Sequence, residues 1–210
     1  MSHADKIVLF HAPQSRSTGT LILLEELGAP YELRVLNMKA GEQRQPAFLA
    51  VNPMGKVPAI LHGDVLVTEQ VAIYLYLADL FPLAGLAPGL DDRRRGPYLR
   101  WMVFYAACFE PAVVDKALKR EPGPHVMCPY GDFDTVLGAL AAQLCTGPFM
   151  LGQDFSAADV LWGNALQWTT MFGMVPATPE IKAYIERTST RPAALRARQK
   201  DAELAASQAV

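Results

Sequence analysis

The stretch from Asn52 to Gln70 holds the residues whose types and spacing point most directly to ligand binding. Pro58 lies where a strand should form ladder hydrogen bonds, although proline has no N–H to donate. The proline either begins the strand at an edge or follows a cis peptide bond. A cis Val57-Pro58 bond would turn the backbone N–H and C=O of Val57 outward, free to pair with something that is not protein.

A second polar stretch, Gln14-Ser15-Arg16-Ser17, connects an apolar run to a helix. The run 7–10 is short and continuous, as is typical of a buried strand, and the leucines after the loop recur at helical spacing until Gly28. The loop thus places two hydroxyl groups at the start of a helix.

The elements around these two stretches follow the order β-α-β-α-β-β-α. The predicted strands are 7–10, 31–36, about 57–61 and 65–67, and the predicted helices are about 18–27, 46–50 and 69–80. Residues 82–89 contain two prolines and two glycines without helical periodicity, which indicates a linker.

Beyond the linker every periodic segment is helical. The predicted helices are 91–119, 133–144, 155–172, 179–189 and one beginning at Pro192. Pro111 predicts a kink near Ala107 in the first of them. The expected fold is therefore an α/β domain over residues 1–81 followed by an all-helical domain over residues 90–210.

Composition excludes several classes of protein. The 210 residues are 51% hydrophobic and 19% charged, which indicates a globular chain, and the net charge of −2 gives no electrostatic case for nucleic acid. No apolar run is long enough to span a bilayer, and no signal-peptide pattern opens the sequence. Three widely spaced cysteines favour neither a disulfide framework nor a metal site. We expect a cytoplasmic protein without a metal or a membrane anchor.

Taken together, these motifs resemble the cytosolic glutathione S-transferases, of a bacterial beta- or theta-like kind. The matching features are Asn52-Pro-Met-Gly-Lys-Val-Pro58 before a hairpin, Thr68-Glu-Gln70 at the next helix, and the helix opener Gly152–Asp159. The resemblance covers nearly the whole chain in the right order. It implies a thioredoxin-like first domain with a cis-Pro58.

The resemblance also implies where glutathione binds as co-substrate. Val57 would pair through its backbone with the cysteinyl part, as in strand addition to a sheet edge. Glu69 would meet the ammonium group of the γ-glutamyl end, and Gln70, at a position where most members have serine, would receive its carboxylate. Lys56 matches a position that in related classes reaches the glycyl carboxylate.

The activating group for the glutathione thiol is expected in the loop before the first helix. Counting back from Gly28, the beta-class cysteine position falls on Arg16 and the theta-class serine position on Gln14. The hydroxyl is therefore that of Ser17 or Ser15, with Ser17 favoured, and Arg16 could add a positive charge near the sulfur. The serine that does not activate the thiol would cap the helix.

The pocket for the second substrate is expected to include His11, Phe104 and Tyr105. Beta-class enzymes carry an asparagine, a threonine and a histidine on the first long helix. The matching positions here are Val103, Ala107 and Glu110. This departure leaves the class of the enzyme open.

The predicted function is a glutathione transferase that conjugates the thiol to small hydrophobic electrophiles, as a cytoplasmic homodimer. One alternative is a glutathione-dependent peroxidase or disulfide reductase. The other is a non-catalytic binding protein with the transferase fold, because a fold does not fix a function.

Overall fold

The structure is a computed structural model that describes residues 6–120 and 123–208, so the outermost residues of both predicted domains and residues 121–122 lie outside it. The chain divides into two compact units. Among the described residues, 6–84 and 191–208 form one, which we call the sheet unit, and 85–120 together with 123–190 form the other, the helical unit.

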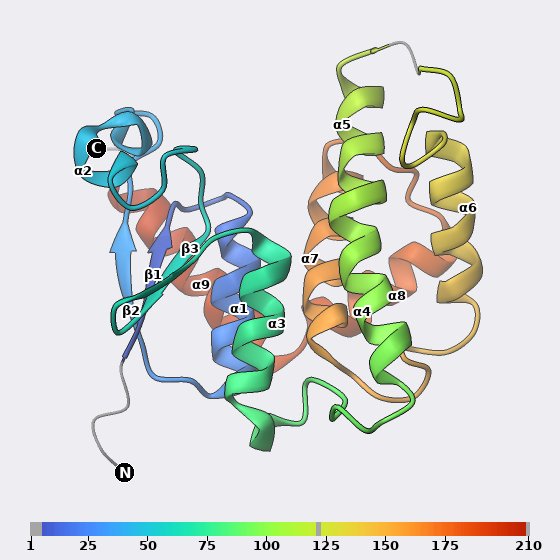
Figure 1. Cartoon of the computed structure of the whole chain (residues 1–210), viewed down its shortest axis with the longest axis horizontal. Helices are drawn as coiled ribbons and strands as arrows, with labels where there is room; N and C mark the ends of the chain where they lie inside the picture. The colour runs from blue at the N-terminus through green and yellow to red at the C-terminus, as the bar shows by residue number, and fades with distance from the viewer. Residues whose placement is uncertain (1–5, 121–122, 209–210) are drawn as a thin grey trace. The chain divides into compact units, whose positions relative to one another are not determined.

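The sheet unit is built on four strands in the spatial order β2-β1-β3-β4. They are β1 (Ile7–His11), β2 (Tyr31–Val35), β3 (Ala59–His62) and β4 (Val65–Val67). β1 pairs in parallel with β2 and antiparallel with β3, which in turn forms a hairpin with β4. This mixed sheet, with its helices, is the thioredoxin-like arrangement that the sequence predicts (Figure 1).

Helices cover this sheet. They are α1 (Ser17–Leu27), α2 (Pro46–Leu49), α3 (Gln70–Leu80) and α9 (Pro192–Ser207), with short 3-10 turns η1 (Glu42–Arg44) and η2 (Pro82–Ala84). α1 ends at Gly28 as predicted, where a left-handed φ of 62° lets the backbone N–H close the last turn. α1 contacts α3 on one side and α9 on another.

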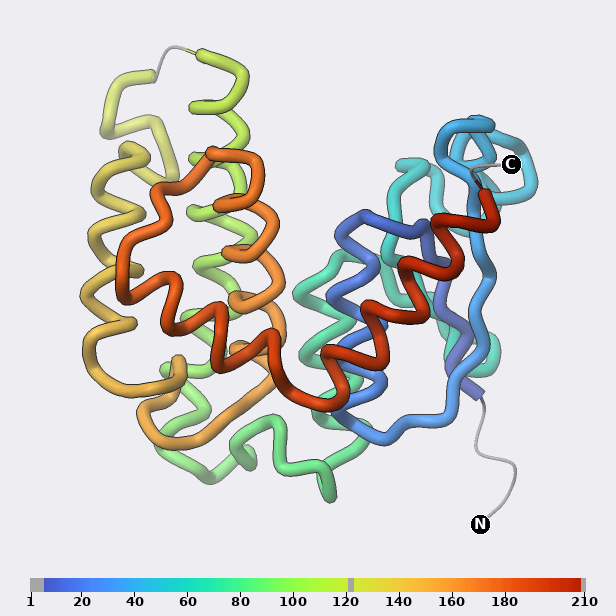
Figure 2. Tube along the Cα trace, turned by 180° about the vertical axis from the view of Figure 1, so that it is seen from behind, coloured from blue at the N-terminus to red at the C-terminus, as the bar shows by residue number. Residues whose placement is uncertain are grey.

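The last helix differs from the expected all-helical domain of residues 90–210. α9 runs along α1, and Figure 2 shows this course from behind. Three alanines of α9, at positions 193, 194 and 197, are buried, and their small side chains allow a close approach. Arg191 adds a two-pronged ion pair to Glu26 of α1, at 2.7 and 2.8 Å.

The helical unit contains the remaining helices. They are α4 (Arg95–Phe104), the π-helical segment η3 (Tyr105–Phe109), α5 (Glu110–Ala117), α6 (Phe133–Leu144), α7 (Ala157–Met171) and α8 (Pro179–Ser189). The predicted helix over 91–119 is thus three consecutive segments. Pro111 has no N–H for the carbonyl of Ala107, and the Glu110 N–H bonds to Tyr105, five residues earlier.

Trp162 of α7 occupies the centre of this unit. Its side chain is fully buried, its ring lies 4.9 Å from that of Phe109 and 5.6 Å from that of Tyr105, and its indole N–H donates to the Trp101 carbonyl at 3.1 Å. The predicted capping box at the start of α7 is present, with the Ser156 N–H bonded to Asp159 at 2.9 Å. No helix among the described residues is long and apolar enough to cross a membrane.

Two glycines of the helical unit give a test of this packing. A Cβ on Gly163 of α7 would lie 2.6 Å from the Cβ of Thr188 on α8, whereas one on Gly138 of α6 would meet nothing within 4 Å. We expect Gly163→Ala to lower the free energy of unfolding by about 1–3 kcal/mol, because the helices must separate. Gly138→Ala should raise it by about 0.5–1 kcal/mol through helix propensity. Urea titrations of both variants check this, and equal effects would contradict the packing.

Candidate functional site

The hydroxyl groups of the loop between β1 and α1 form one hydrogen-bonded chain. Ser15 Oγ lies 2.8 Å from Ser17 Oγ and donates to the Ala12 carbonyl at 2.7 Å. Ser17 Oγ accepts the Ala12 N–H at 3.0 Å. Ser15 is partly exposed and Ser17 is completely buried. Only Ser15 of the two predicted serines therefore presents its side chain at the surface.

His11, at the end of β1, continues this chain into the interior. Its Nδ1 lies 2.8 Å from Ser17 Oγ, and its Nε2 lies 3.1 Å from Oδ1 of Asp201 on α9. The imidazole is completely buried. From the sequence we predict that His11 lines the pocket of the second substrate. In the structure its ring instead faces the hydroxyl loop and α9.

Asp201 anchors the loop from the opposite end of the chain. Besides the contact with His11, its carboxylate accepts the Gln14 N–H at 3.0 Å and the Thr18 hydroxyl at 2.7 Å. Gln14 adopts a φ of 57°, which is rare for a residue with a side chain and costs about 1–3 kcal/mol. The bond to Asp201 helps to hold the loop in this strained conformation.

The partners of Asp201 also determine its ionisation. Burial by itself raises the pKa of this carboxyl, but the hydrogen bonds from His11, Thr18 and the Gln14 N–H outweigh it and hold the pKa below its ordinary value. Asp201 is therefore a carboxylate at neutral pH.

The second half of the site is the loop before β3. Asn52 is buried, donates to the Lys56 carbonyl at 2.8 Å and accepts the Met54 N–H at 3.1 Å. Gly55 has a φ of 60°, and a Cβ there would lie 2.8 Å from a backbone oxygen. These constraints fix the course of the chain into Val57.

The Val57-Pro58 bond is cis, one of the two alternatives that the sequence left open. In the part of the chain that the structure describes, the Val57 N–H and C=O have no hydrogen-bond partner. Phe10 is paired with Ala59 in the β1–β3 ladder, so Val57 and the β1–α1 loop leave the sheet at the same end. An unpaired edge thus lies beside the hydroxyl loop.

The start of α3 completes the site. Glu69 precedes the helix with a φ of 65°, a second strained residue of the kind that persists at functional sites. Gln70 donates from Nε2 to the Arg16 carbonyl at 3.3 Å, which ties the helix start to the hydroxyl loop. The free N–H groups of the first turn of α3 can receive an anion.

The structure brings together most, but not all, of the predicted site residues. Those that gather at one end of the sheet unit are His11, Ser15, Arg16, Ser17, Val57, Pro58 and Gln70, with Glu69 next to the last. Lys56 is exposed beside Val57. Phe104 and Tyr105 belong to the helical unit, where Tyr105 is 2% exposed within the aromatic core and Phe104 is half-buried.

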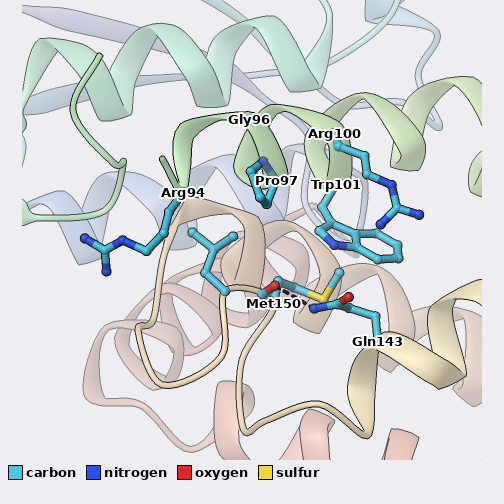
Figure 3. A pocket seen from close by; sticks show the side chains of 8 residues that line it. Arg94, Gly96, Pro97, Arg100, Trp101, Gln143 and Met150 are labelled. Carbon is cyan, nitrogen blue, oxygen red and sulfur yellow. Dashed lines mark hydrogen bonds between the residues drawn. The ribbon is translucent and has the colours of Figure 1, made fainter. Parts of the chain in front are cut away.

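A hollow of about 490 Å³ lies in the helical unit and is shown in Figure 3. It is lined by Arg94, Arg100, Trp101, Gln143 and Met150, among others, and not by Phe104 or Tyr105. Arg94 is held by Asp92 and Asp154, and the Arg100 guanidinium stacks over the Trp101 ring at 4.2 Å. The hollow therefore does not coincide with the pocket that the sequence predicts.

Sequence reasoning missed Asp201 and Thr18. The available signal was the spacing on α9, where Asp201 follows Ala193 and Ala197 at intervals of four residues. An acid on the buried stripe of a helix needs a partner, which marks it as a candidate. Its partner Thr18 lies more than 180 residues earlier in the sequence.

Replacement of Asp201 by asparagine should change the pH dependence of stability. The pKa of Asp201 is lower in the folded than in the unfolded protein. Its carboxylate therefore contributes fully to the free energy of unfolding above the unfolded pKa of about 3.9, and this contribution is lost as the pH falls through the folded pKa. We expect Asp201→Asn to lose about 2 kcal/mol of unfolding free energy at pH 7 and less at pH 3. Denaturant titrations at both pH values measure this, and a constant difference would contradict it.

The family model described as "Glutathione S-transferase, N-terminal domain" matches residues 5–79. The disulfide-bond oxidoreductase YfcG of Escherichia coli is 28% identical over 203 residues, which cover 89% of this chain and 92% of that protein.

The similar solved structures include two glutathione S-transferases that match over nearly the full length. A sphingomonad glutathione S-transferase complexed with glutathione is 30% identical, with a TM-score of 0.76, and 93% of this chain and 98% of that chain are covered. A beta-class enzyme of Sphingomonas chungbukensis is also 30% identical, with a TM-score of 0.76 and coverages of 92% and 98%. The chain belongs to the glutathione S-transferase family.

Proposed function

We propose that the protein is a glutathione transferase that uses the hydroxyl of Ser15 to stabilise the glutathione thiolate. The observation that carries the proposal is the unpaired backbone of Val57 at the same end of the sheet as the hydroxyl loop. A peptide added to that edge runs antiparallel to the chain before β3, and its cysteinyl side chain can reach the loop.

Each end of the tripeptide has a matching group. The ammonium of the γ-glutamyl end would meet the carboxylate of Glu69, and the adjacent carboxylate would accept N–H groups from the first turn of α3. Lys56 would meet the glycyl carboxylate. The cysteinyl N–H and C=O would pair with those of Val57, which fixes the sulfur in one place.

The chemical requirement is a lower thiol pKa. A thiol with a pKa of about 8.5 is mostly protonated at neutral pH, and lowering this value by two units favours the thiolate by roughly 2.7 kcal/mol. One hydroxyl donor and the N-terminus of α1 together supply a stabilisation of that size. Ser15 is partly exposed and its hydroxyl can turn from the Ala12 carbonyl to a sulfur, whereas Ser17 is buried.

The thiolate then attacks an electrophilic carbon and forms the C–S bond, while the leaving group departs with the bonding electrons or an adjacent acceptor takes them up. We assign a small hydrophobic electrophile to this reaction, as family membership favours. Of the two aromatic residues predicted for its pocket, Tyr105 is buried against Trp162 and Phe104 is half-buried.

Glutathione affinity tests the binding mode. Glu69→Gln removes the negative charge that meets the ligand ammonium, and we expect the dissociation constant to rise about 10- to 100-fold. Asp64→Asn, in the exposed hairpin turn of the same unit, is the matched control and should bind like wild type. Isothermal titration calorimetry measures both. Absence of glutathione binding by the wild type would instead support a non-catalytic protein with this fold.

Substitution of the two serines should have different effects on kinetics and on stability. We expect Ser15→Ala to lower kcat/KM for a chloronitrobenzene about 10- to 100-fold while glutathione still binds, because the lost hydrogen bond acts on the thiolate. We expect Ser17→Ala to lower the melting temperature as well, since it removes the hydroxyl that bonds the Ala12 N–H and His11 Nδ1. Full activity in Ser15→Ala, together with a folded but inactive Ser17→Ala, would favour Ser17 as the activating group.

A disulfide reductase is the second candidate, because the similar E. coli protein YfcG is a disulfide-bond oxidoreductase. Such a reaction also needs a bound thiolate, and here it would be that of glutathione, since the three cysteines lie at positions 108, 128 and 145, outside the hydroxyl loop. Turnover of a small mixed disulfide faster than conjugation would favour this candidate.

A further inference from the structure

The hydrogen-bonded chain that starts at Ser15 does not end at the loop. Hydrogen bonds join Ser15 Oγ to Ser17 Oγ and Ser17 Oγ to His11 Nδ1, at 2.8 Å each. His11 Nε2 then lies 3.1 Å from the Asp201 carboxylate, within ion-pair distance but without the geometry of a hydrogen bond. We infer that His11 and Asp201 are positioning residues that accept the thiol proton through the two serines. This inference rests on the proposed function, because it concerns the thiol of the bound glutathione.

Before glutathione binds, the proposed relay needs the His11 tautomer whose proton is on Nε2, the nitrogen 3.1 Å from the Asp201 carboxylate. In that tautomer Nδ1 accepts the Ser17 hydroxyl. Ser17 Oγ accepts the Ala12 N–H, and the Ser15 hydroxyl donates to the Ala12 carbonyl or to Ser17.

Transfer of one proton reverses the direction of these bonds. The thiol proton moves to Ser15 Oγ, the former Ser15 proton moves to Ser17 Oγ, and the former Ser17 proton moves to His11 Nδ1. The products are a thiolate that accepts from Ser15 and an imidazolium between Ser17 and Asp201. No electrons are transferred, and after conjugation the proton returns along the chain to water at Ser15.

The surroundings of His11 allow its ring to hold the proton. The imidazole is completely buried, so an imidazolium needs a fixed counter-charge, and the Asp201 carboxylate supplies it. Arg198, one turn earlier on α9, interacts with Asp201, and burial lowers the pKa of its guanidinium. On α1 the Ser17 hydroxyl contacts the ring and the Thr18 hydroxyl contacts the Asp201 carboxylate, and in the sheet His11 is paired with Val35 of β2.

A purely structural role makes a different prediction. If the network only fixes the shape of the loop, every hydrogen bond to Asp201 should matter in the same way. Thr18 donates to the same carboxylate at 2.7 Å but is not part of the chain between Ser15 and His11. Thr18→Val is therefore the variant that separates the two roles.

The test measures the pKa of enzyme-bound glutathione from its ultraviolet thiolate absorbance. In the wild type we expect a pKa below that of the free thiol. Asp201→Asn and His11→Asn should each raise the thiol pKa of bound glutathione by about one unit. At a pH below the wild-type value, the thiolate fraction then falls about tenfold. Thr18→Val should lower the melting temperature without moving the pKa. Glu203→Gln, exposed on α9, should change neither.

A second measurement follows the proton directly by nitrogen NMR of the imidazoles, with His11 assigned by the His11→Asn spectrum. Glutathione should convert His11 to imidazolium, and S-methylglutathione, which has no thiol proton, should not. An unchanged His11 with glutathione, or a pKa shift in Thr18→Val equal to that in Asp201→Asn, would overturn the relay. Loss of glutathione binding by the wild type would instead overturn the proposed function.

Discussion

The loop between β1 and α1 depends on one carboxylate, that of Asp201. It accepts hydrogen bonds from the Gln14 backbone and the Thr18 hydroxyl and lies against His11, so three points of the loop and its flanks are tied to α9. Without this anchor the strained Gln14 conformation would have no long-range support. The final helix therefore takes part in shaping the site, although it begins more than 170 residues after the loop.

This constraint matters because the opposite side of the site is already fixed. Asn52 and Gly55 hold the chain that enters β3, and they leave the backbone of Val57 without a partner among the described residues. A ligand that pairs with this edge is positioned relative to the sheet. The loop must then be rigid for its hydroxyl to meet the ligand sulfur at hydrogen-bond distance.

Local patterns predicted much of this molecule. The order of strands and helices, the end of α1 at Gly28 and the capping box at Ser156 were read correctly, because each depends on residues within one or two turns. The burial of Ser17 and the packing of α9 on α1 were not predicted. Ser15 and Ser17 are chemically alike in the sequence, and only contacts with His11 and the distant Asp201 distinguish them.

The most direct test is a crystal structure of the protein with glutathione. We expect the cysteinyl N–H and C=O to pair with those of Val57. The sulfur should lie within hydrogen-bond distance of Ser15 Oγ, while Ser17 stays bonded to His11. A tripeptide bound away from Val57, or a sulfur that contacts neither serine, would contradict the proposed binding mode.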